Sequence, residues 1–293
     1  MNEKFITTDS FYVSRLLPKR VQNSNKGTYG TVLNIAGSTY YSGAAYLSSI
    51  ASLKVGAGLV RLASELGVID TVSKMSPDIT FINLGSNNIG TIPKNGDKFL
   101  KNTKEPNSII IGCGLTTFEP VREFVLKVLL NYANSSVPII IDADAINILS
   151  TMKNPIIPLN SVITPHPLEL SRLIKVDVQT IQEDRITWAN FASAKFDCIV
   201  VLKGKDTVIS IPNGNTFVNP TGNSALSCGG TGDILSGMIA GFAAQGMKLE
   251  DACVLACYLH GLSGELASKE LSEYSALASD ILNYIPYAIK RFI

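Results

Sequence analysis

The sequence predicts an α/β protein in which helices cover both faces of a mostly parallel central sheet. Short β-branched apolar runs, such as residues 108–111 and 198–202, alternate with longer helical patterns. The runs are apolar at successive positions, which is typical of strands buried on both faces. Glycine or polar residues follow nearly every run, and ligands of such sheets bind beyond the carboxyl ends of the strands. The functional residues are therefore expected at the strand ends.

The predicted elements follow from the same patterns in chain order. Strands are expected over residues 31–36, 59–62, 108–111, 137–141, 161–164 and 198–202, and a hairpin over 206–211 and 216–218. Helices are expected over residues 42–55, 120–132, 231–245, 249–269 and 276–291. Residues 85–107 are rich in Asn, Gly, Lys and Pro and are predicted to form a surface excursion. We expect one domain, residues 1–293, without internal repeats.

The composition excludes several classes of partner. The 293 residues are 46% hydrophobic and carry a formal net charge of +1, so neither nucleic acid nor an anionic membrane is an expected partner. The amino terminus lacks the apolar core of a secretory signal, and no apolar run reaches the roughly 20 residues of a membrane-spanning helix. The five cysteines show no C-x-x-C spacing, which fits a reducing cytoplasm.

The strongest signal for chemistry is a glycine-rich turn before a helix, Gly229-Gly230-Thr231-Gly232-Asp233. Backbone N–H groups at such a helix start converge on an anion, and the helix dipole adds to the attraction. A carboxylate beside that anion is placed to remove the proton of a hydroxyl that attacks a phosphate. The sequence therefore predicts Asp233 as a catalytic base. The competing interpretation is a simple turn in which Asp233 caps the helix.

Two further strand ends carry candidate residues. Lys203 follows the strand at 198–202, where its charge could meet a nucleotide phosphate, although a solvated hairpin turn is the preferred interpretation of Lys205. Prolines flank His166 at the end of the strand at 161–164, which suits a side chain presented to a ligand. Glu169 is a candidate for a Mg²⁺ shell, or merely a first-turn carboxylate of the next helix. His260 is expected to be a packed histidine within a helix.

Asp142 and Asp144 close another strand. One of them is a candidate for orienting water or Mg²⁺, and for Asp144 capping of a short helix is an equally good interpretation. Residues 37–45 are small enough to let a bulky ligand approach. They contain no G-x-G-x-x-G for hydride transfer, and the chain contains no G-x-S-x-G of a serine hydrolase.

Taken together, these stretches resemble the ADP/ATP-dependent (S)-NAD(P)H-hydrate dehydratase family, a branch of the ribokinase-like superfamily. The stretches that carry the resemblance are residues 26–30, 37–38, 42–45, 56–60, 112–115, 142–145, 164–169, 202–207, 230–233 and 258–261. The chain departs from the family pattern at Asn25, at Cys113 within Gly112-Cys113-Gly114, and at residues 225–228. The last departure affects the shape of the loop before the glycine turn.

The resemblance implies a ribokinase-like three-layer αβα sandwich and a metabolite-repair enzyme. Its reaction would be the dehydration of the S form of hydrated NADH or NADPH with ADP, or ATP, as co-substrate, and with Mg²⁺. The residues implied for the hydrated substrate are Ala44, Gly114, His166 and Asp233. Those implied for the adenine nucleotide are Lys203, Gly204, Lys205, Asp206, Thr207 and Gly232, to which the glycine turn adds Gly230 and Thr231.

The resemblance also implies a homo-oligomer of four or more subunits, and a separate NAD(P)H-hydrate epimerase as a working partner, because many relatives carry an epimerase domain. Two alternatives remain open. A vitamin-precursor kinase of the same superfamily would use the same glycine turn and Asp233, but it resembles Thr-Pro-Asn-x-x-Glu where this chain has His166. A catalytically silent nucleotide-binding regulator is disfavoured because Asp233 and the glycine turn are both present.

Overall fold

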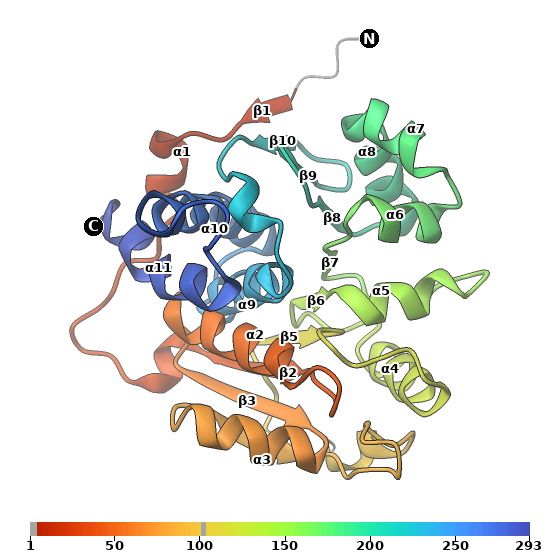
Figure 1. Cartoon of the computed structure of the whole chain (residues 1–293). Coiled ribbons are helices and arrows are strands. Elements are labelled where there is room, and N and C mark those ends of the chain that lie inside the picture. Colours follow the sequence, from red (N-terminus) through yellow and green to blue (C-terminus); the bar gives the residue numbers. More distant parts are fainter. Residues whose placement is uncertain (1–4, 101–103) are drawn as a thin grey trace.

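A single sheet of ten strands runs through the computed structural model, which describes residues 5–100 and 104–293 (Figure 1). In spatial order the strands are β1 (Phe5–Thr7), β10 (Thr216–Asn219), β9 (Thr207–Ser210), β8 (Ile199–Leu202), β7 (Ser161–Ile163), β6 (Ile139–Ile141), β5 (Ser108–Ile111), β2 (Thr31–Ile35), β3 (Leu59–Ser64) and β4 (Thr80–Asn83). Only β9 runs antiparallel to its neighbours, because short turns join it to both β8 and β10. The mostly parallel sheet expected from the sequence is confirmed.

Helices cover both faces of this sheet and make the expected three layers (Figure 1). One face carries α2 (Ser42–Lys54), α3 (Leu66–Met75), α9 (Thr231–Ala244), α10 (Leu249–Leu271) and α11 (Ala278–Lys290). The other carries α4 (Glu119–Asn131), α5 (Ala143–Ser150), α6 (Pro167–Ile174), α7 (Val178–Glu183) and α8 (Arg185–Phe196). The short helix α1 (Ser10–Ser14) packs near α10.

Successive strand residues supply the two cores alternately. Ile110 of β5 faces the layer that contains α9, whereas its neighbours Ile109 and Ile111 face the opposite layer. All three side chains are fully buried. The sequence pattern of uninterrupted isoleucines therefore reflects a strand with no solvent-facing side.

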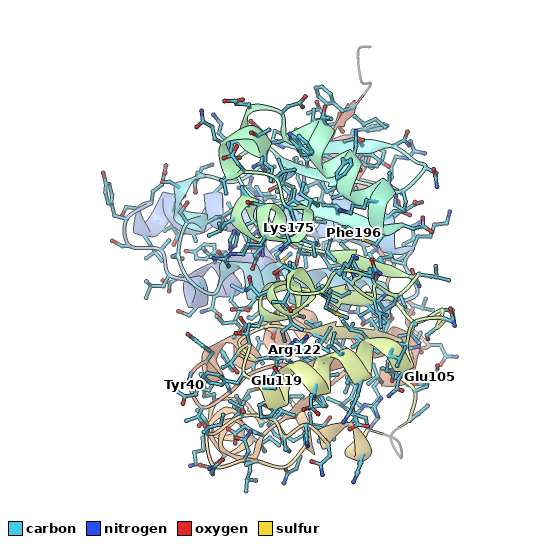
Figure 2. All side chains as sticks on the ribbon, turned by 90° about the vertical axis from the view of Figure 1, so that its right-hand side faces the viewer. Tyr40, Glu105, Glu119, Arg122, Lys175 and Phe196 are labelled. Carbon is cyan, nitrogen blue, oxygen red and sulfur yellow. The ribbon has the colours of Figure 1, made fainter. Side chains whose placement is uncertain are left out.

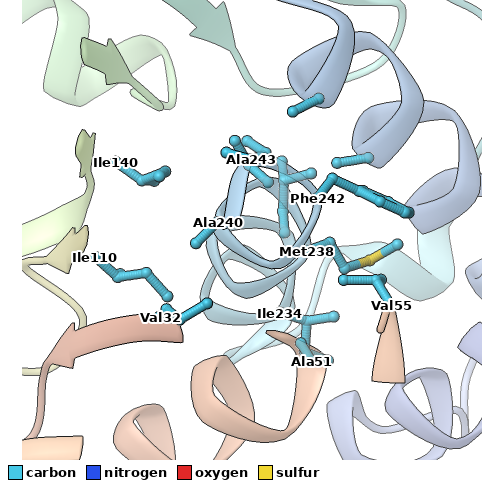
Figure 3. Packing of buried hydrophobic residues seen from close by; sticks show 14 of the residues in the cluster. Val32, Ala51, Val55, Ile110, Ile140, Ile234, Met238, Ala240, Phe242 and Ala243 are labelled. Carbon is cyan, nitrogen blue, oxygen red and sulfur yellow. The ribbon is translucent and has the colours of Figure 1, made fainter. Parts of the chain in front are cut away.

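Helix α9 lies at the centre of one core and is buried over nearly its whole length (Figure 3). Its own side chains Ile234, Met238 and Phe242 pack into this core, and glycines on its α2 side permit close contact between the two helices. A Cβ placed on Gly237 would lie 2.3 Å from the Ser48 carbonyl oxygen. The close packing fixes the amino terminus of α9 relative to the sheet, and this terminus carries Asp233.

The outer helices are amphipathic. In α4, Phe124 and Val125 are fully buried, whereas Glu119 and Arg122 face solvent and form an ion pair of 3.0 Å (Figure 2). None of the helices in the described ranges is both long enough and apolar enough to cross a bilayer.

Several elements differ from the expectation. The expected strand at 59–62 extends to Ser64, and α3, β4 and β1 were not anticipated. The segment at 85–107, of which residues 101–103 lie outside the described residues, was expected to be a surface excursion. That prediction is wrong in part, because Ile92 is 1% exposed and belongs to the core beneath α4. The few apolar residues of this segment are scattered among polar ones without a helical or strand period, so the burial of Ile92 could not be predicted from the pattern.

Candidate active site

The carboxyl ends of β6 and β8 hold a buried ion pair. Asp142 follows β6 and Lys203 follows β8, and Lys203 Nζ lies 2.8 Å from Asp142 Oδ1. Ser236 of α9 donates to Asp142 Oδ2 over 2.7 Å. Burial alone would raise the pKa of Asp142, but the Lys203 charge and hydrogen bonds from Lys203, Thr164 and Ser236 hold it below its usual range. Asp142 is therefore ionised and ties the sheet edge to α9.

Glu169 extends this charged group toward α6. Its carboxylate is 4% exposed, and Oε2 lies 3.9 Å from Lys203 Nζ. The same oxygen accepts the backbone N–H of His166 over 2.8 Å. Burial raises the pKa of Glu169, which the Lys203 charge partly counters. The Lys203 ammonium is thus the positive partner of two buried carboxylates, Asp142 and Glu169.

His166 occupies the N-cap position of α6. Its Nδ1 accepts the backbone N–H groups of Leu168 and Glu169 over 3.2 and 3.3 Å, while 47% of the side chain is exposed. Partial burial, followed by the Lys203 charge, lowers the pKa of His166. The imidazole is therefore neutral at pH 7, fixed by the helix start and open to solvent on its other side.

Asp233 lies in the first turn of α9, close to Asp142 and Cys113. One ligand atom from each of these three residues lies within 4.8 Å of the others. Burial and then the negative charge of Asp142 raise the pKa of Asp233 to about 7, while the Cys113 thiol and Lys203 act in the opposite direction. The helix-cap interpretation of Asp233 is wrong, because Gly230 occupies the N-cap position.

Beside this group, a cavity of about 460 Å³ opens between the β8–β9 turn and the helices α9 and α10. Of the residues expected to bind the nucleotide, Lys203, Gly204, Lys205, Asp206, Thr207, Thr231 and Gly232 line it. Gly232 meets Lys203 there, since a Cβ on Gly232 would lie 3.4 Å from Lys203 Nζ. Gly230 is not among the wall residues that the structure describes. Its Cα faces Leu47 and Ala278, and its φ of +97° makes the turn into α9.

The expected substrate residues Ala44 and Gly114 lie against each other. A Cβ on Gly114 would lie 2.9 Å from Ala44 Cβ, and Gly114 has a φ of +63°. Gly114 follows Cys113, which lies beside Asp233, so Ala44 and Gly114 lie on that side of the carboxyl. His166 is linked to this side of the site by a chain of polar contacts. Glu169 accepts its backbone N–H, and Lys203 lies between the carboxylates of Glu169 and Asp142. These residues come from six separate parts of the chain.

Other parts of the site were not anticipated. Residues 219–224 and 226–227 form one wall of the cavity, and α10 contributes Cys257, His260 and Gly261. Arg185 donates to the carbonyl oxygens of Leu202 and Lys203 over 2.9 and 3.3 Å and so supports the turn after β8. No spacing in the sequence links these residues, because their proximity depends on tertiary packing.

The role suggested for Asp144 also changes. Asp144 does not cap α5, since Asp142 occupies the N-cap position and makes no side-chain capping bond. Instead, Asp144 accepts the backbone N–H of Thr116 over 2.8 Å and so fixes the loop after Gly114. Thr116 has a φ of +72°, a conformation that this hydrogen bond helps to hold.

Comparison with known proteins places these features in a family context. A family model described as NAD(P)H-hydrate dehydratase matches residues 32–287. The ADP-dependent (S)-NAD(P)H-hydrate dehydratase of Bacillus subtilis is 36% identical over 294 residues, which cover 100% of both chains. A crystal structure of the ADP/ATP-dependent NAD(P)H-hydrate dehydratase of that organism, co-crystallised with ATP/Mg²⁺, superposes with a TM-score of 0.86 at 34% identity, again over 100% of each chain.

Fused relatives also match. The bifunctional NAD(P)H-hydrate repair enzyme of Moorella thermoacetica is 37% identical over 280 residues, which are 94% of this chain and 52% of that one. The present chain thus spans about half the length of that relative. Residues 32–287, which the family model matches, include every candidate residue of the site described above.

Proposed function

Because the chain belongs to the NAD(P)H-hydrate dehydratase family, we propose that it dehydrates the S form of hydrated NADH or NADPH, with ADP or ATP as phosphoryl donor. The observation that carries this proposal is the amino terminus of α9. There the Asp233 carboxyl follows directly on Gly232, which lines a nucleotide-sized cavity beside Lys203.

Asp233 is the proposed base. The hydrate carries a hydroxyl on a ring carbon next to the ring nitrogen. The oxygen of this hydroxyl attacks the terminal phosphorus of the nucleotide, and Asp233 takes the hydroxyl proton. A carboxyl with a pKa of about 7 holds a proton much better than an ordinary aspartate, yet a large part of it is ionised at neutral pH. Both properties suit a group that must accept a proton during the reaction and release it afterwards.

The transferring phosphoryl group is proposed to lie at the helix start. The backbone N–H groups of Thr231 and Gly232 have no partner within α9, because the first four amides of any helix lack one. They therefore stabilise charge on the phosphoryl oxygens, and the Lys203 ammonium adds a positive charge close to Gly232. The Asp142 and Glu169 carboxylates hold that ammonium in position.

The residues also fit a magnesium ion that accompanies the nucleotide. Glu169 Oε1 has a single close polar contact within the described chain, 3.5 Å from His166 Nε2, and carboxylate oxygen is a ligand that Mg²⁺ prefers. Glu169 would hold the ion, directly or through water. When bound, the ion would neutralise phosphate charge.

Elimination completes the proposed reaction. The lone pair of the ring nitrogen expels inorganic phosphate, and loss of a proton from the neighbouring carbon restores the dihydropyridine ring. ADP then yields AMP, or ATP yields ADP, together with phosphate and NAD(P)H. Ala44, Gly114 and His166 are the proposed contacts of the hydrated nucleotide, and only small residues let the ring come close to Asp233.

The test is a direct assay of repair. Purified protein is incubated with NADH hydrate, Mg²⁺ and either ADP or ATP, and the return of dihydronicotinamide absorbance is followed. We expect recovery with wild-type protein and almost none with Asp233→Asn. Accumulation of a stable phosphorylated hydrate would identify a kinase, and an unchanged mixture would indicate a silent binder.

The kinase alternative has less support, since the full-length relative and the superposed structure are both named as dehydratases. For the setting of the reaction we propose a reducing cytoplasm, an assembly of four or more subunits and a separate epimerase. The last proposal rests on the fused relatives, in which one chain carries the name of a bifunctional repair enzyme.

A further inference from the structure

His260 lines the nucleotide cavity, although the sequence suggested only a packed residue. It lies on α10 between Cys257 and Gly261, which line the same wall. Its side chain is buried, with the whole residue 8% exposed. Of all the buried side-chain nitrogens and oxygens in the wall, only its Nε2 has no hydrogen-bond partner in the described part of the chain.

The protonation state of this imidazole follows from its surroundings. Burial lowers the pKa of His260 to about 4, a hydrogen bond with the Thr231 backbone opposes this, and the Lys203 charge adds to it. The ring is therefore neutral at pH 7. Since Nε2 is unpartnered and the contact with the Thr231 backbone favours the protonated ring, we assign the single hydrogen of the neutral ring to Nδ1. Nε2 then carries a lone pair and can only accept a hydrogen bond.

A buried acceptor without a partner is unfavourable until a donor reaches it. The phosphates of a nucleotide offer no donor at neutral pH, and they are proposed to lie near Lys203 and Gly232. The lining of the same cavity includes Leu226 and Leu235, whose apolar side chains suit a flat heterocycle. The only hydrogen-bond donor on the ring of an adenine nucleotide is its exocyclic amino group.

We infer that His260 is a specificity-determining residue that accepts, at Nε2, a hydrogen bond from the exocyclic amino group of adenine. This inference rests on the proposed use of an adenine nucleotide. A hypoxanthine nucleotide carries an oxygen in place of that amino group, so its lone pairs would face the lone pair of Nε2. The cavity is therefore expected to prefer ADP over IDP.

The experiment measures binding, independently of turnover. Dissociation constants of Mg²⁺-ADP and Mg²⁺-IDP are determined by titration calorimetry for wild type, His260→Phe and His260→Gln. We expect wild type to prefer ADP about tenfold, the size of one such hydrogen bond. His260→Phe keeps a planar ring but has no acceptor, so its preference should fall to near unity. The Gln amide can turn either its oxygen or its nitrogen toward the base, so His260→Gln should also lose the preference.

Two controls make the outcome specific. Cys257→Ala changes the same wall one turn earlier and should weaken both nucleotides equally, leaving their ratio unchanged. Thermal unfolding midpoints show which variants remain folded. An ADP-to-IDP ratio that His260→Phe leaves intact overturns the inference, as does a wild-type ratio near one.

A third comparison separates the base from the sugar. If His260→Phe abolishes discrimination between ADP and 2′-deoxy-ADP instead, the imidazole recognises the ribose and the adenine assignment is wrong. If wild-type protein binds neither ADP nor ATP, the proposed function itself fails. Normal ADP binding with an unchanged ratio refutes only the role of His260.

Discussion

The Asp233 carboxyl is the proposed catalytic base, and its surroundings disfavour its ionised form. It lies beside the ionised Asp142, and burial raises its pKa to about 7. The group therefore binds a proton more tightly in the folded protein than in the unfolded chain. Folding is stabilised by that proton at low pH, and this stability is lost as the pH rises from about 4 toward 7.

This linkage gives the first prediction. Asp233→Asn should reduce turnover by at least about 10²-fold, since general-base catalysis contributes 10²–10⁴. Because the amide has no charge to bury, the same variant should unfold at a higher temperature than wild type at pH 8. The advantage should disappear near pH 4. Calorimetric unfolding at several pH values measures it, and equal midpoints at pH 8 would contradict the raised pKa.

The pH dependence of the wild-type enzyme provides a second prediction. The base must be ionised, so kcat/KM should rise with pH and level off above about 7. The neutral, partly exposed His166 should not add a second step above that pH, because its pKa is lowered. A rate already constant from pH 5 upward would show that Asp233 does not titrate as the structure indicates.

Lys203 has a structural role in addition to its proposed contact with phosphate. Its ammonium lies 2.8 Å from Asp142 and 3.9 Å from Glu169, both of which are buried. Removing one partner of a buried pair leaves an uncompensated charge, which costs about 3–5 kcal/mol. Loss of Lys203 therefore threatens folding as well as binding.

A double-mutant cycle tests this third prediction. Lys203→Met should lower the free energy of unfolding by about 3–5 kcal/mol, and addition of Asp142→Asn should recover part of the loss. The solvent-exposed pair Lys74–Asp70, at 2.6 Å, is the matched control. Lys74→Met is expected to cost less than about 1 kcal/mol. Equal effects at both sites, measured by urea unfolding, would show that burial does not matter here.

At the scale of elements, the position of α9 depends on glycine. Gly237 and Gly241 face α2, and their absent side chains let the two helices come close enough for Ser52 Oγ to donate to the Gly237 carbonyl over 2.8 Å. A Cβ on Gly237 would also lie 2.8 Å from that of Ala51. A side chain at position 237 would push α9 away from α2 and so displace the amino terminus of α9, which holds Asp233.

The fourth prediction follows from this contact. Gly237→Ala should destabilise the protein by about 1–3 kcal/mol or more, although alanine is the better helix former by about 0.5–1 kcal/mol. It should also reduce kcat, because α9 must shift. Gly43→Ala, where a Cβ in α2 would meet nothing within 4 Å, is the stability control and should be neutral or slightly stabilising. A stabilised Gly237→Ala protein would refute the close packing.

At the scale of the whole molecule, the nucleotide cavity joins parts of the fold that are distant in sequence. Residues 203–207 come from the turn between β8 and β9, residues 219–224 and 226–227 from the end of β10 and the loop after it, and His260 from a helix of the last third of the chain. A ligand that occupies this cavity binds only the folded state. Its binding free energy is therefore added to the stability of the whole molecule.

The fifth prediction is a ligand-induced shift. Mg²⁺-ADP at about 100 times its dissociation constant should stabilise the fold by roughly 2.7 kcal/mol and raise the unfolding midpoint by several degrees. Asp233→Asn should show a similar shift, because that carboxyl acts on the substrate hydroxyl and is not in the cavity wall. Inorganic phosphate alone is the control. If phosphate alone raises the unfolding midpoint as much as ADP does, the adenine ring of the nucleotide makes no contact with the cavity.

Much of this architecture was accessible from the sequence. Uninterrupted apolar runs such as residues 108–111 predicted buried parallel strands, and the glycine turn before α9 predicted the position of Asp233. Local signals of this kind depend on residues close in the chain, whose geometry is set by backbone sterics and hydrogen bonding. The strand-end positions of Lys203 and His166, and the place of Glu169 in the first turn of the next helix, were predicted for the same reason.

The tertiary structure alone decided which of these residues meet and what charge they carry. The salt bridge between Asp142 and Lys203, the raised pKa of Asp233 and the burial of Ile92 depend on contacts across many residues of chain. The sequence by itself determined the layers and the chemical groups at the strand ends. Their distances and desolvation arise only when separate segments pack together, because electrostatic energy depends on position and burial rather than on residue type.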